Sequence, residues 1–381
     1  MKERKPEIPG IALARQAGDR ARSGELSCRA LHSIDGALLS AGCFHMLMAA
    51  VVPAVFFFAS FFLLPSSSEN AALPPSTPAR GDWLMFRRDP CRASFVPSVG
   101  PCTFGGKLKW SFPAEGGIDS SPAVYRGVIY VGCDDGYLYA IDERNGKMLW
   151  RSHLGAQVKS SPCLGRQLLF VGCEDCCLYA LNFVTGKVDW KFQAGGKVSS
   201  SPVCFGGMVC FGGWDGTVYA LDEKNGSLKW KFVTSDASAG RITSSPAFLN
   251  GVVYVTSHDG FLYALSAENG ALQWRYKTGG KIFCSPMVMN GMVYFGSWDK
   301  NFYAVEALSG KTVWKFPCAE YFSISPAGAG DRVFVGNDDL KVYCLDAAKG
   351  KLLWKTQLNS PNPLLSSSPA IAGDKIGRAH V

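Results

Sequence analysis

The eleven residues "AIDERNGKMLW" (140–150) decide the fold, because close variants of them recur along the chain. Asn145-Gly146 is a turn pair that tolerates positive φ, and Asp142 can accept backbone N–H groups within that turn. Trp150 offers a large face to bury against a neighbouring sheet. The peptide therefore predicts a turn that docks one sheet on the next. Its other copies are "ALNFVTGKVDW", "ALDEKNGSLKW", "ALSAENGALQW", "AVEALSGKTVW" and "CLDAAKGKLLW".

The copies keep a period of 40 residues, with one step of 44 where "TSDASAG" (234–240) is inserted. A fixed period of this length is the signature of a repeat architecture. Ser-Pro pairs keep the same spacing, from Ser121-Pro122 to Ser368-Pro369. The positions predicted to dock neighbouring sheets are Trp110, Trp150, Trp190, Trp230, Trp274, Trp314 and Trp354, with Gly146, Gly186, Gly226, Gly270, Gly310 and Gly350.

Within one unit, turn signals separate four short apolar segments, residues 120–125, 127–132, 137–141 and 147–152. In "GVIYVG" (127–132) both alternating sets of side chains are apolar, so both faces of the sheet must be covered. Small four-stranded sheets that repeat in this way pack radially around an axis. The sequence therefore predicts an all-β fold, a β-propeller with four-stranded blades. We expect six complete blades, an orphan N-terminal strand and a truncated seventh unit.

The regions before the repeats differ in composition. A basic tail (1–36) precedes a segment without charged side chains (37–64), which is long enough to span a bilayer. A Ser/Pro-rich linker (65–81) follows, then the propeller (82–374) and a final segment (375–381). Seven Lys or Arg precede the apolar segment and only Arg80 closely follows it, which keeps the N-terminus cytoplasmic. We expect a membrane anchor with the propeller on the extracytoplasmic side, or a secreted propeller if the segment is a cleaved signal peptide.

The repeat resembles the pyrroloquinoline-quinone-type (PQQ) propellers, whose blades carry a tryptophan-docking motif of the form A-x-D-x-x-x-G-K-x-x-W. Ala140, Asp142, Gly146, Lys147 and Trp150 match every position of it. The lead-in "GDWLMFRRDPCRASFVP" (81–97) is also similar to that of bacterial members, among them the outer-membrane-assembly propeller lipoproteins. The resemblance implies a protein-binding propeller or, as in the quinoprotein dehydrogenases, a cofactor-dependent enzyme.

Closure of the ring requires the chain ends to share a blade, because an open sheet edge is otherwise left unpaired. "KLKWSF" (107–112) is predicted to be an orphan fourth strand that needs partners from the C-terminus. The seventh unit is expected to stop after one strand, and "KIGRAHV" (375–381) fits no position of the repeat, so it is interpreted as a non-native tail. The intact ring is expected to have seven blades, or eight as the resemblance implies.

The turn after the second strand of each unit keeps one Asp, which suits either a hairpin turn or a ring of carboxylates around a cation. Three of these turns place Cys176, Lys300 and Leu340 where positive φ is expected. The position before the Asp is aromatic or His in three units, which favours a recognition face on the repeat scaffold; free drift of loop residues is the alternative. The six acids are Asp135, Asp175, Asp215, Asp259, Asp299 and Asp339.

The vicinal pair Cys176 and Cys177 is the chemical feature of most interest, because the resemblance implies a vicinal disulfide beside a quinone, with a stacked Trp and an acidic calcium ligand. Trp214 and Trp298 are the candidate stacking residues. The cofactor candidates are therefore PQQ and calcium. Adjacent residues of a strand point to opposite faces, so Cys177 is expected to be a small buried apolar residue instead. No catalytic residue can be assigned.

The function that we predict is a non-catalytic, membrane-tethered binding scaffold with a protein or peptide partner. The alternatives are a PQQ- and calcium-dependent alcohol or sugar dehydrogenase and an extracellular ligand-sensing head. A net charge of +8 without long runs of like charge argues against nucleic acid as a partner. Cys91 and Cys102 can form a disulfide if the protein is exported. The five His form no recognisable hydrolase constellation.

Overall fold

The computed structural model describes residues 84–87, 89–93, 95–96, 108–235, 240–358, 368–372 and 375–377. All of them lie in Ser33–Val381, the second of the two units into which the chain divides. The predicted basic tail, membrane segment and linker (1–36, 37–64 and 65–81) lie outside the described residues, as does Cys102. Within the described ranges there is no helix long and apolar enough to cross a membrane.

The described residues form six four-stranded antiparallel sheets, each built from strands consecutive in sequence, which we call blades 1 to 6. Blade 1 contains β2 (Ala123–Tyr125), β3 (Val128–Gly132), β4 (Tyr137–Asp142) and β5 (Met148–His153). Blade 2 contains β6 (Cys163–Leu164), β7 (Leu168–Gly172), β8 (Cys177–Asn182) and β9 (Val188–Gln193). Blade 3 contains β10 (Val203–Phe205), β11 (Met208–Gly212), β12 (Thr217–Asp222) and β13 (Leu228–Val233).

The second half of the chain repeats this arrangement. Blade 4 contains β14 (Ala247–Leu249), β15 (Val252–Thr256), β16 (Phe261–Ser266) and β17 (Leu272–Lys277). Blade 5 contains β18 (Met287–Met289), β19 (Met292–Gly296), β20 (Asn301–Glu306) and β21 (Thr312–Pro317). Blade 6 contains β22 (Ala327–Ala329), β23 (Arg332–Gly336), β24 (Lys341–Asp346) and β25 (Leu352–Gln357). A three-stranded seventh sheet combines β1 (Phe95–Val96), β26 (Ala370–Ala372) and β27 (Lys375–Gly377).

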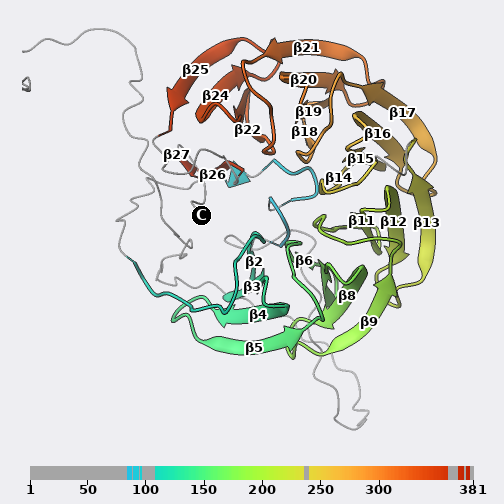
Figure 1. Cartoon of the computed structure of the whole chain (residues 1–381), viewed down its shortest axis with the longest axis vertical. Coiled ribbons are helices and arrows are strands. Elements are labelled where there is room, and N and C mark those ends of the chain that lie inside the picture. Colours follow the sequence, from blue (N-terminus) through green and yellow to red (C-terminus); the bar gives the residue numbers. More distant parts are fainter. Residues whose placement is uncertain are drawn as a thin grey trace, which may run out of the picture. The chain divides into compact units, whose positions relative to one another are not determined.

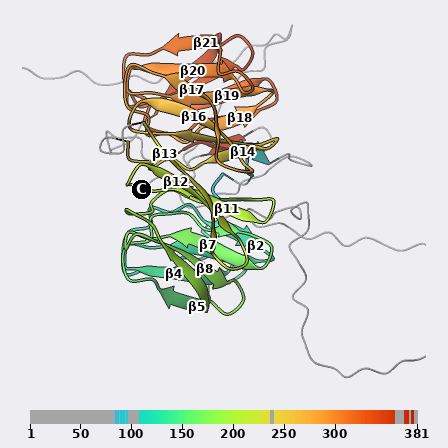
Figure 2. The ribbon, with the colours of Figure 1, turned by 90° about the vertical axis from the view of Figure 1, so that its right-hand side faces the viewer.

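The blades are arranged around a common axis, with the first strand of each blade innermost and the fourth on the rim (Figure 1). Figure 2 shows the same blades edge-on. From β6 to β26, the innermost strand of each sheet contacts that of the next. The interior between blades is apolar, because the second and third strands are almost completely buried on both faces. The predicted β-propeller with six complete blades is thus confirmed.

The repeated peptide around residue 140 has a geometric explanation. Ala140 lies directly opposite Trp150 in the β4–β5 pairing, and the register then shifts by one residue, so that Ile141 opposes Met148. The same pairing and shift recur in the other five blades. The extra residue in each fourth strand is a β-bulge, which bends the strand locally. The motif therefore pairs a small residue with the indole at the bulge.

Each indole lies against the next blade. An ideal Cβ on Gly270 would sit 2.6 Å from Cε3 of Trp230, and the φ of Gly270 is +73°, so only glycine fits without strain. The same contact joins Trp110 to Gly146 and recurs at the remaining joints. The indole Nε1 also donates to a backbone carbonyl of the next blade at distances from 2.9 to 3.3 Å for Trp110, Trp150, Trp230, Trp274 and Trp314. Trp190 is different, because its Nε1 has no hydrogen-bond partner.

The Ser-Pro pairs form a second, inner set of joints. The backbone N–H of Ser121 donates to Oγ of Ser161 in the next blade, and this bond repeats around the ring as far as Ser368. Its length lies between 2.8 and 3.1 Å at all six steps. The serine spacing, 40 residues except for steps of 44 and 43, therefore reflects a series of hydrogen bonds that joins the innermost segments and satisfies N–H groups that no strand partner reaches.

Two predictions about the chain ends are wrong. Residues 108–112 form no strand, because no neighbouring strand among the described residues offers them backbone hydrogen bonds. The seventh unit does not stop after one strand: β27 pairs with β26 in the usual antiparallel register, with Ile376 opposite Ile371. Both side chains belong to one apolar cluster, which explains why "KIG" (375–377) fits the position of a second strand.

The N-terminal end of the propeller follows a path that the repeat does not predict. The described residues of the range 84–96, namely 84–87, 89–93 and 95–96, which we call the lead-in segment, lie at the centre of the ring (Figure 1). Carbonyl groups of Leu84, Pro90, Cys91 and Ala93 accept backbone N–H groups from the innermost strands of blades 2, 4, 5 and 6 in that order. β1 then pairs in parallel with β26. The lead-in segment therefore covers inner strand edges that would otherwise be unpaired.

Candidate functional site

The turns after the second strands gather on one face of the ring, together with the links that enter each blade. In blade 1, Oδ1 of Asp135 accepts the backbone N–H of Tyr137, and its Oδ2 accepts the hydroxyl of Tyr139 at 2.5 Å. All six blades repeat this pair of bonds. Each Asp thus tightens its own turn.

The electrostatics of these turns agree with that role. Burial alone would raise the pKa of Asp299, but hydrogen bonds from Tyr303 and Asn301 hold it below the usual range. Within the described part of the chain, no three His, Cys, Asp or Glu side chains lie close enough together to hold a metal ion. As predicted, Cys176, Lys300 and Leu340 adopt positive φ, of 72°, 68° and 61°.

The residue before each turn Asp points toward the neighbouring link and varies between blades. In blades 4 to 6, two of these positions and two link residues build a continuous row of ring contacts. The ring centroids of His258 and Phe283 are 4.1 Å apart, those of Phe283 and Trp298 are 4.2 Å apart, and those of Trp298 and Tyr321 are 5.4 Å apart. Trp298 and Tyr321 each remain 39 % exposed. We call these four residues the aromatic row.

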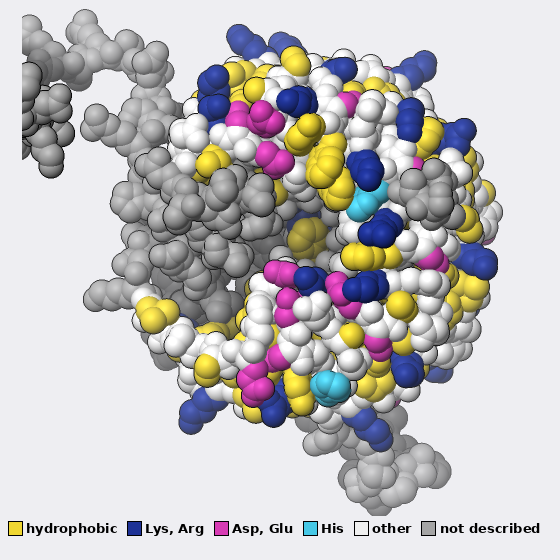
Figure 3. Space-filling model, viewed as in Figure 1, with side chains coloured by type: hydrophobic (Ala, Val, Ile, Leu, Met, Phe, Trp, Pro, Cys, Tyr) yellow, Lys and Arg dark blue, Asp and Glu magenta, His cyan; other side chains and the backbone are white. Residues whose placement is uncertain are grey.

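Cations extend the aromatic row at both ends. Lys300 lies over the ring of Tyr321 at 5.1 Å. At the other end, Arg241 lies 5.0 Å and Lys197 5.1 Å from the ring of Trp214 in blade 3. Cations over aromatic faces are attracted by the ring quadrupole. In Figure 3, hydrophobic side chains, Lys or Arg side chains and a His lie side by side on one face around the hollow centre.

Acidic residues occupy the same turn position in the remaining blades. Glu174 in blade 2 binds Lys197 at 2.6 Å, and Asp338 in blade 6 accepts the hydroxyl of Ser323 at 3.1 Å. In blade 1, Asp134 lies 3.8 Å from Lys159. The face is therefore divided into an aromatic and cationic arc over blades 3 to 5 and acidic positions on either side of it.

His258 has the most perturbed histidine environment among the described residues. Burial, followed by the nearby charges of Lys281 and Arg241, lowers its pKa to about 4, while Asp259 acts in the opposite direction. Its Nε2 lies 2.8 Å from Oγ1 of Thr243. The imidazole is therefore neutral near pH 7, which suits its stacking on Phe283.

The vicinal cysteines do not form a cofactor site with the other candidates. Both thiols are free. Cys177 is 2 % exposed, belongs to the core between blades 1 and 2, and points its Sγ toward Oε1 of Gln193 at 3.3 Å. Its expected role as a small buried residue is confirmed, and burial raises the pKa of its thiol.

A quinone and calcium site does not fit the residues that the structure describes. Trp214 and Trp298 belong to blades 3 and 5, and each donates its indole N–H to a serine hydroxyl, of Ser199 and Ser323. Asp175 beside the cysteines is bound to the backbone of Cys177 and to the hydroxyl of Tyr179. Among the described residues next to the cysteine pair, Asp175 and Glu174 are thus both already bonded within the protein, Glu174 to Lys197 at 2.6 Å.

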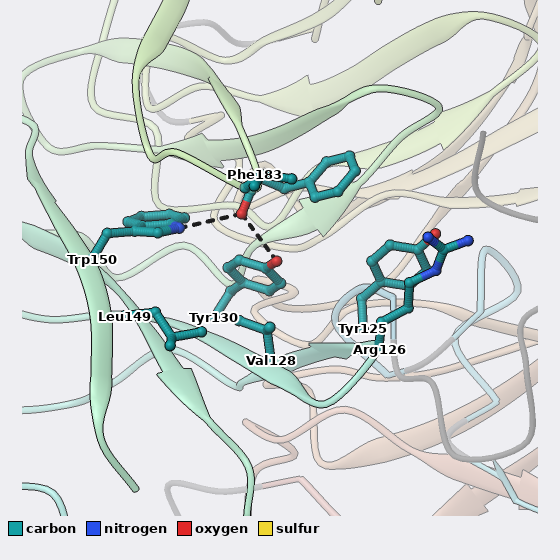
Figure 4. A pocket seen from close by; sticks show the side chains of 8 residues that line it. Tyr125, Arg126, Val128, Tyr130, Leu149, Trp150 and Phe183 are labelled. Atoms are coloured by element: carbon teal, nitrogen blue, oxygen red, sulfur yellow. Dashed lines mark hydrogen bonds between the residues drawn. The ribbon is translucent and has the colours of Figure 1, made fainter. Parts of the chain in front are cut away.

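A small pocket of about 230 Å³ lies at the joint of blades 1 and 2 (Figure 4). Trp150 and Tyr130 both donate to the backbone carbonyl of Phe183, at 3.3 and 3.1 Å. Leu149 and Val128 supply apolar walls. The indole of Trp150 and the hydroxyl of Tyr130 are thus bonded within the joint, whereas the buried hydroxyl of Tyr125, which also lines the pocket, has no hydrogen-bond partner among the described residues.

The residues of the aromatic row were only partly predictable. Trp298 and His258 stand out in sequence because they replace the usual turn residue. Phe283 and Tyr321 lie in the links between blades and were missed, because stacking across two blades has no local signature. The structure does show a regular rule: the backbone N–H of Trp298 donates to the carbonyl of Lys281, and the same bond between turn and link recurs in the other described blades. It fixes which link residues lie beside each turn.

The class of protein follows from this geometry: the chain is a PQQ-type repeat β-propeller. The family model described as "Outer membrane protein assembly factor BamB" matches residues 103–231, 214–320 and 301–377. The chain belongs to this family. No curated protein matches the sequence.

Solved structures share the fold at low sequence identity. BamB from Moraxella catarrhalis is similar with a TM-score of 0.61 and 19 % identity, over 70 % of this chain and 82 % of that one. A europium-containing methanol dehydrogenase gives a TM-score of 0.56 and 14 % identity, over 66 % of this chain and 70 % of that one. The computationally designed protein Ika8 gives 0.51 and 15 %, over 68 % of this chain and 92 % of that one.

Proposed function

We propose that this protein is a non-catalytic binding scaffold, tethered to a membrane, that binds a protein segment on its aromatic row. The family description, an assembly factor for outer membrane proteins, supports a role in protein assembly. Repeat scaffolds commonly bind through variable residues on one face while their structural positions stay constant. Here the turn Asp is constant in all six blades and the residue before it changes.

The observation that carries the proposal is the exposed part of the aromatic row. The rings of Trp298 and Tyr321 are in tilted contact, and the Trp298 indole donates to the hydroxyl of Ser323 at 3.2 Å, yet 39 % of each residue remains exposed. Rigid aromatic side chains lose little entropy on binding and are enriched among the residues that dominate protein interfaces. The row is thus a pre-ordered apolar surface.

The charges beside the row favour a particular partner chemistry. Lys300, Arg241 and Lys197 border the aromatic rings. Acidic side chains on a partner would pair with Arg241 and would compete with Glu174 and Glu320, which already bind Lys197 at 2.6 Å and Lys300 at 3.7 Å. Its aromatic side chains would stack on the row. We therefore propose an extended protein segment that combines aromatic and acidic residues.

A binding experiment tests this proposal. A short synthetic peptide with alternating Phe and Asp is titrated against the full chain, and a matched peptide carries Lys in place of Asp. We expect the acidic peptide to bind in a saturable manner and the variant Trp298→Ala to weaken it about tenfold or more, as for an interface hot spot. Leu353→Ala is the control, since Leu353 is 45 % exposed on rim strand β25. Equal binding by Trp298→Ala and wild type would contradict the proposal.

The location is part of the same proposal. The charge distribution around residues 37–64 supports a membrane anchor with the propeller on the extracytoplasmic side. Alkaline phosphatase fused to the C-terminus of the full chain is active only outside the cytoplasm. High activity in the membrane fraction is expected, whereas activity in the released fraction would indicate a cleaved segment and no activity would contradict export.

A PQQ-dependent dehydrogenase is the alternative that the fold allows, because a methanol dehydrogenase shares the fold. The donor set described above argues against it. Titration of the full chain with PQQ and Ca²⁺, followed by calorimetry, separates the two functions. Saturable one-to-one binding would revive the dehydrogenase, and heats equal to those of buffer dilution would support the scaffold.

A further inference from the structure

The lead-in segment carries two arginines into the interior of the ring. Arg87 is 3 % exposed and Arg92 is fully buried. Buried guanidinium groups are rare unless their donors are satisfied, because desolvation of a charge is costly. The two guanidinium groups differ in how many of their donors are hydrogen-bonded, and this difference indicates a binding site.

Arg92 is satisfied by backbone carbonyls. Its Nε donates to the carbonyl of Pro246 at 2.9 Å, and its Nη2 donates to those of Ser201 and Pro202 at 3.1 Å each. Its Nη1 donates to the carbonyl of Phe86 at 2.5 Å. Arg92 therefore joins the lead-in segment to the innermost segments of blades 3 and 4.

Arg87 has only one of its nitrogens bonded. Its Nε donates to the carbonyl of Arg92 at 3.0 Å, while the buried Nη1 and Nη2 have no hydrogen-bond partner among the residues that the structure describes. Burial and the charge of Arg92 together lower the pKa of Arg87 to about 9, against the opposing effect of Asp89. Asp89 is the one carboxylate among the main influences on this pKa. The guanidinium is still charged near pH 7, and its two buried Nη atoms lack an acceptor among the described residues.

We propose that Arg87 binds a small oxyanion at the centre of the ring. The two Nη atoms present parallel N–H donors, which match two oxygens of a phosphate, sulfate or carboxylate. An anion there would neutralise part of the charge that Arg87 and Arg92 share. Because Arg87 is 3 % exposed, the ligand must be small enough to be enclosed.

The site lies between the lead-in segment and blade 5. Cys284, at the entry to blade 5, is among the groups whose charge state influences Arg87. Its thiol is itself held between the backbone N–H and carbonyl of Gly296, at 3.1 and 3.2 Å. The sulfur is therefore engaged with its own blade and does not replace the missing acceptor. This site is separate from the aromatic row, so it does not depend on the proposed function.

Ligand-linked stability of the full chain tests the site, with inorganic phosphate as the probe and sodium chloride balancing the ionic strength. A ligand that binds only the folded state stabilises it by about 1.4 kcal/mol for each tenfold increase above its Kd. We expect the urea midpoint of the wild type to rise with phosphate. Arg87→Met should show no such rise, and without phosphate it should be at least as stable as the wild type, because an unpaired buried charge has been removed.

The surface variant Arg332→Met controls for general charge effects, since it also removes one cation but from a side chain that is 55 % exposed. It should keep the phosphate response of the wild type. Phosphorus NMR line broadening on the wild type measures binding directly, should Arg87→Met fail to fold. An equal phosphate response in wild type and Arg87→Met, or no line broadening with the wild type, would overturn the site.

Discussion

The joint between blades 3 and 4 allows a matched comparison of two glycines. Gly270 and Gly251 both adopt positive φ, of +73° and +78°. An added Cβ on Gly270 would lie 2.6 Å from Cε3 of Trp230, whereas nothing lies within 4 Å of the same atom on Gly251. Substitution of each by Ala therefore introduces the same backbone strain, and only Gly270→Ala also displaces the indole.

The expected magnitudes follow from these two terms. Left-handed backbone costs an alanine about 1–2 kcal/mol, which is the whole effect expected for Gly251→Ala. Overpacking against a well-packed ring adds about 1–3 kcal/mol at Gly270. Gly270→Ala should therefore lower the free energy of unfolding clearly more than Gly251→Ala does.

Urea unfolding followed by tryptophan fluorescence measures both variants in parallel with the wild type. Hydrogen exchange locates the change, which we expect in β13 and β17, the fourth strands on either side of the joint. If Gly270→Ala and Gly251→Ala lower stability equally, the contact between Trp230 and Gly270 does not hold the blades together, and the proposed role of the repeated tryptophans fails.

Three further predictions concern other contacts. Trp230→Phe keeps most of the apolar contact but leaves the carbonyl of Ala267, which accepts the indole Nε1–H at 2.9 Å, without a donor. We expect the free energy of unfolding in urea to fall by about 1–3 kcal/mol, and an unchanged value would contradict this prediction. Arg92→Met leaves four carbonyls without their donor, so we expect destabilisation of at least about 3 kcal/mol and earlier cleavage of the lead-in segment in limited proteolysis, whereas Arg332→Met should resemble the wild type. The pKa of His258 is lowered to about 4 by burial and by Lys281 and Arg241, so the unfolded chain binds its proton more readily and stability should fall as pH drops from about 6.5 to about 4. His258→Gln should reduce that pH dependence in thermal unfolding, and an unchanged slope would show that other groups cause it.

The regular part of the fold was predictable because each blade repeats the same local chemistry. The four segments 120–125, 127–132, 137–141 and 147–152 correspond closely to β2 to β5. The turn pair and the alternation of apolar residues act within a few positions, so a sequence pattern can reveal them. The chain ends were harder, because residues 108–112 look like a strand but have no strand to pair with among the described residues.

The lead-in segment and the aromatic row depend on distant contacts instead. Arg92 bonds to carbonyls that lie 109, 110 and 154 residues away, which no local pattern encodes. The arginines of the lead-in segment suggest an exposed, charged segment. The burial of Arg92 is possible because the surrounding ring supplies carbonyl acceptors for its guanidinium group. Likewise, Phe283 and Tyr321 look like ordinary link residues until the fold places them on either side of Trp298.

The path of the lead-in segment also constrains the order of assembly. Residues 84–96 leave the ribosome before any blade exists, yet their acceptors and donors belong to strands made much later, up to β26. Loop closure over such separations is slow. The lead-in segment can therefore form its final contacts only after the last strands of the domain have been synthesised. A nascent chain that lacks blade 6 would leave the carbonyl of Ala93 without its donor. The lead-in segment can therefore bind fully at the centre of the ring only after blade 6 has been synthesised.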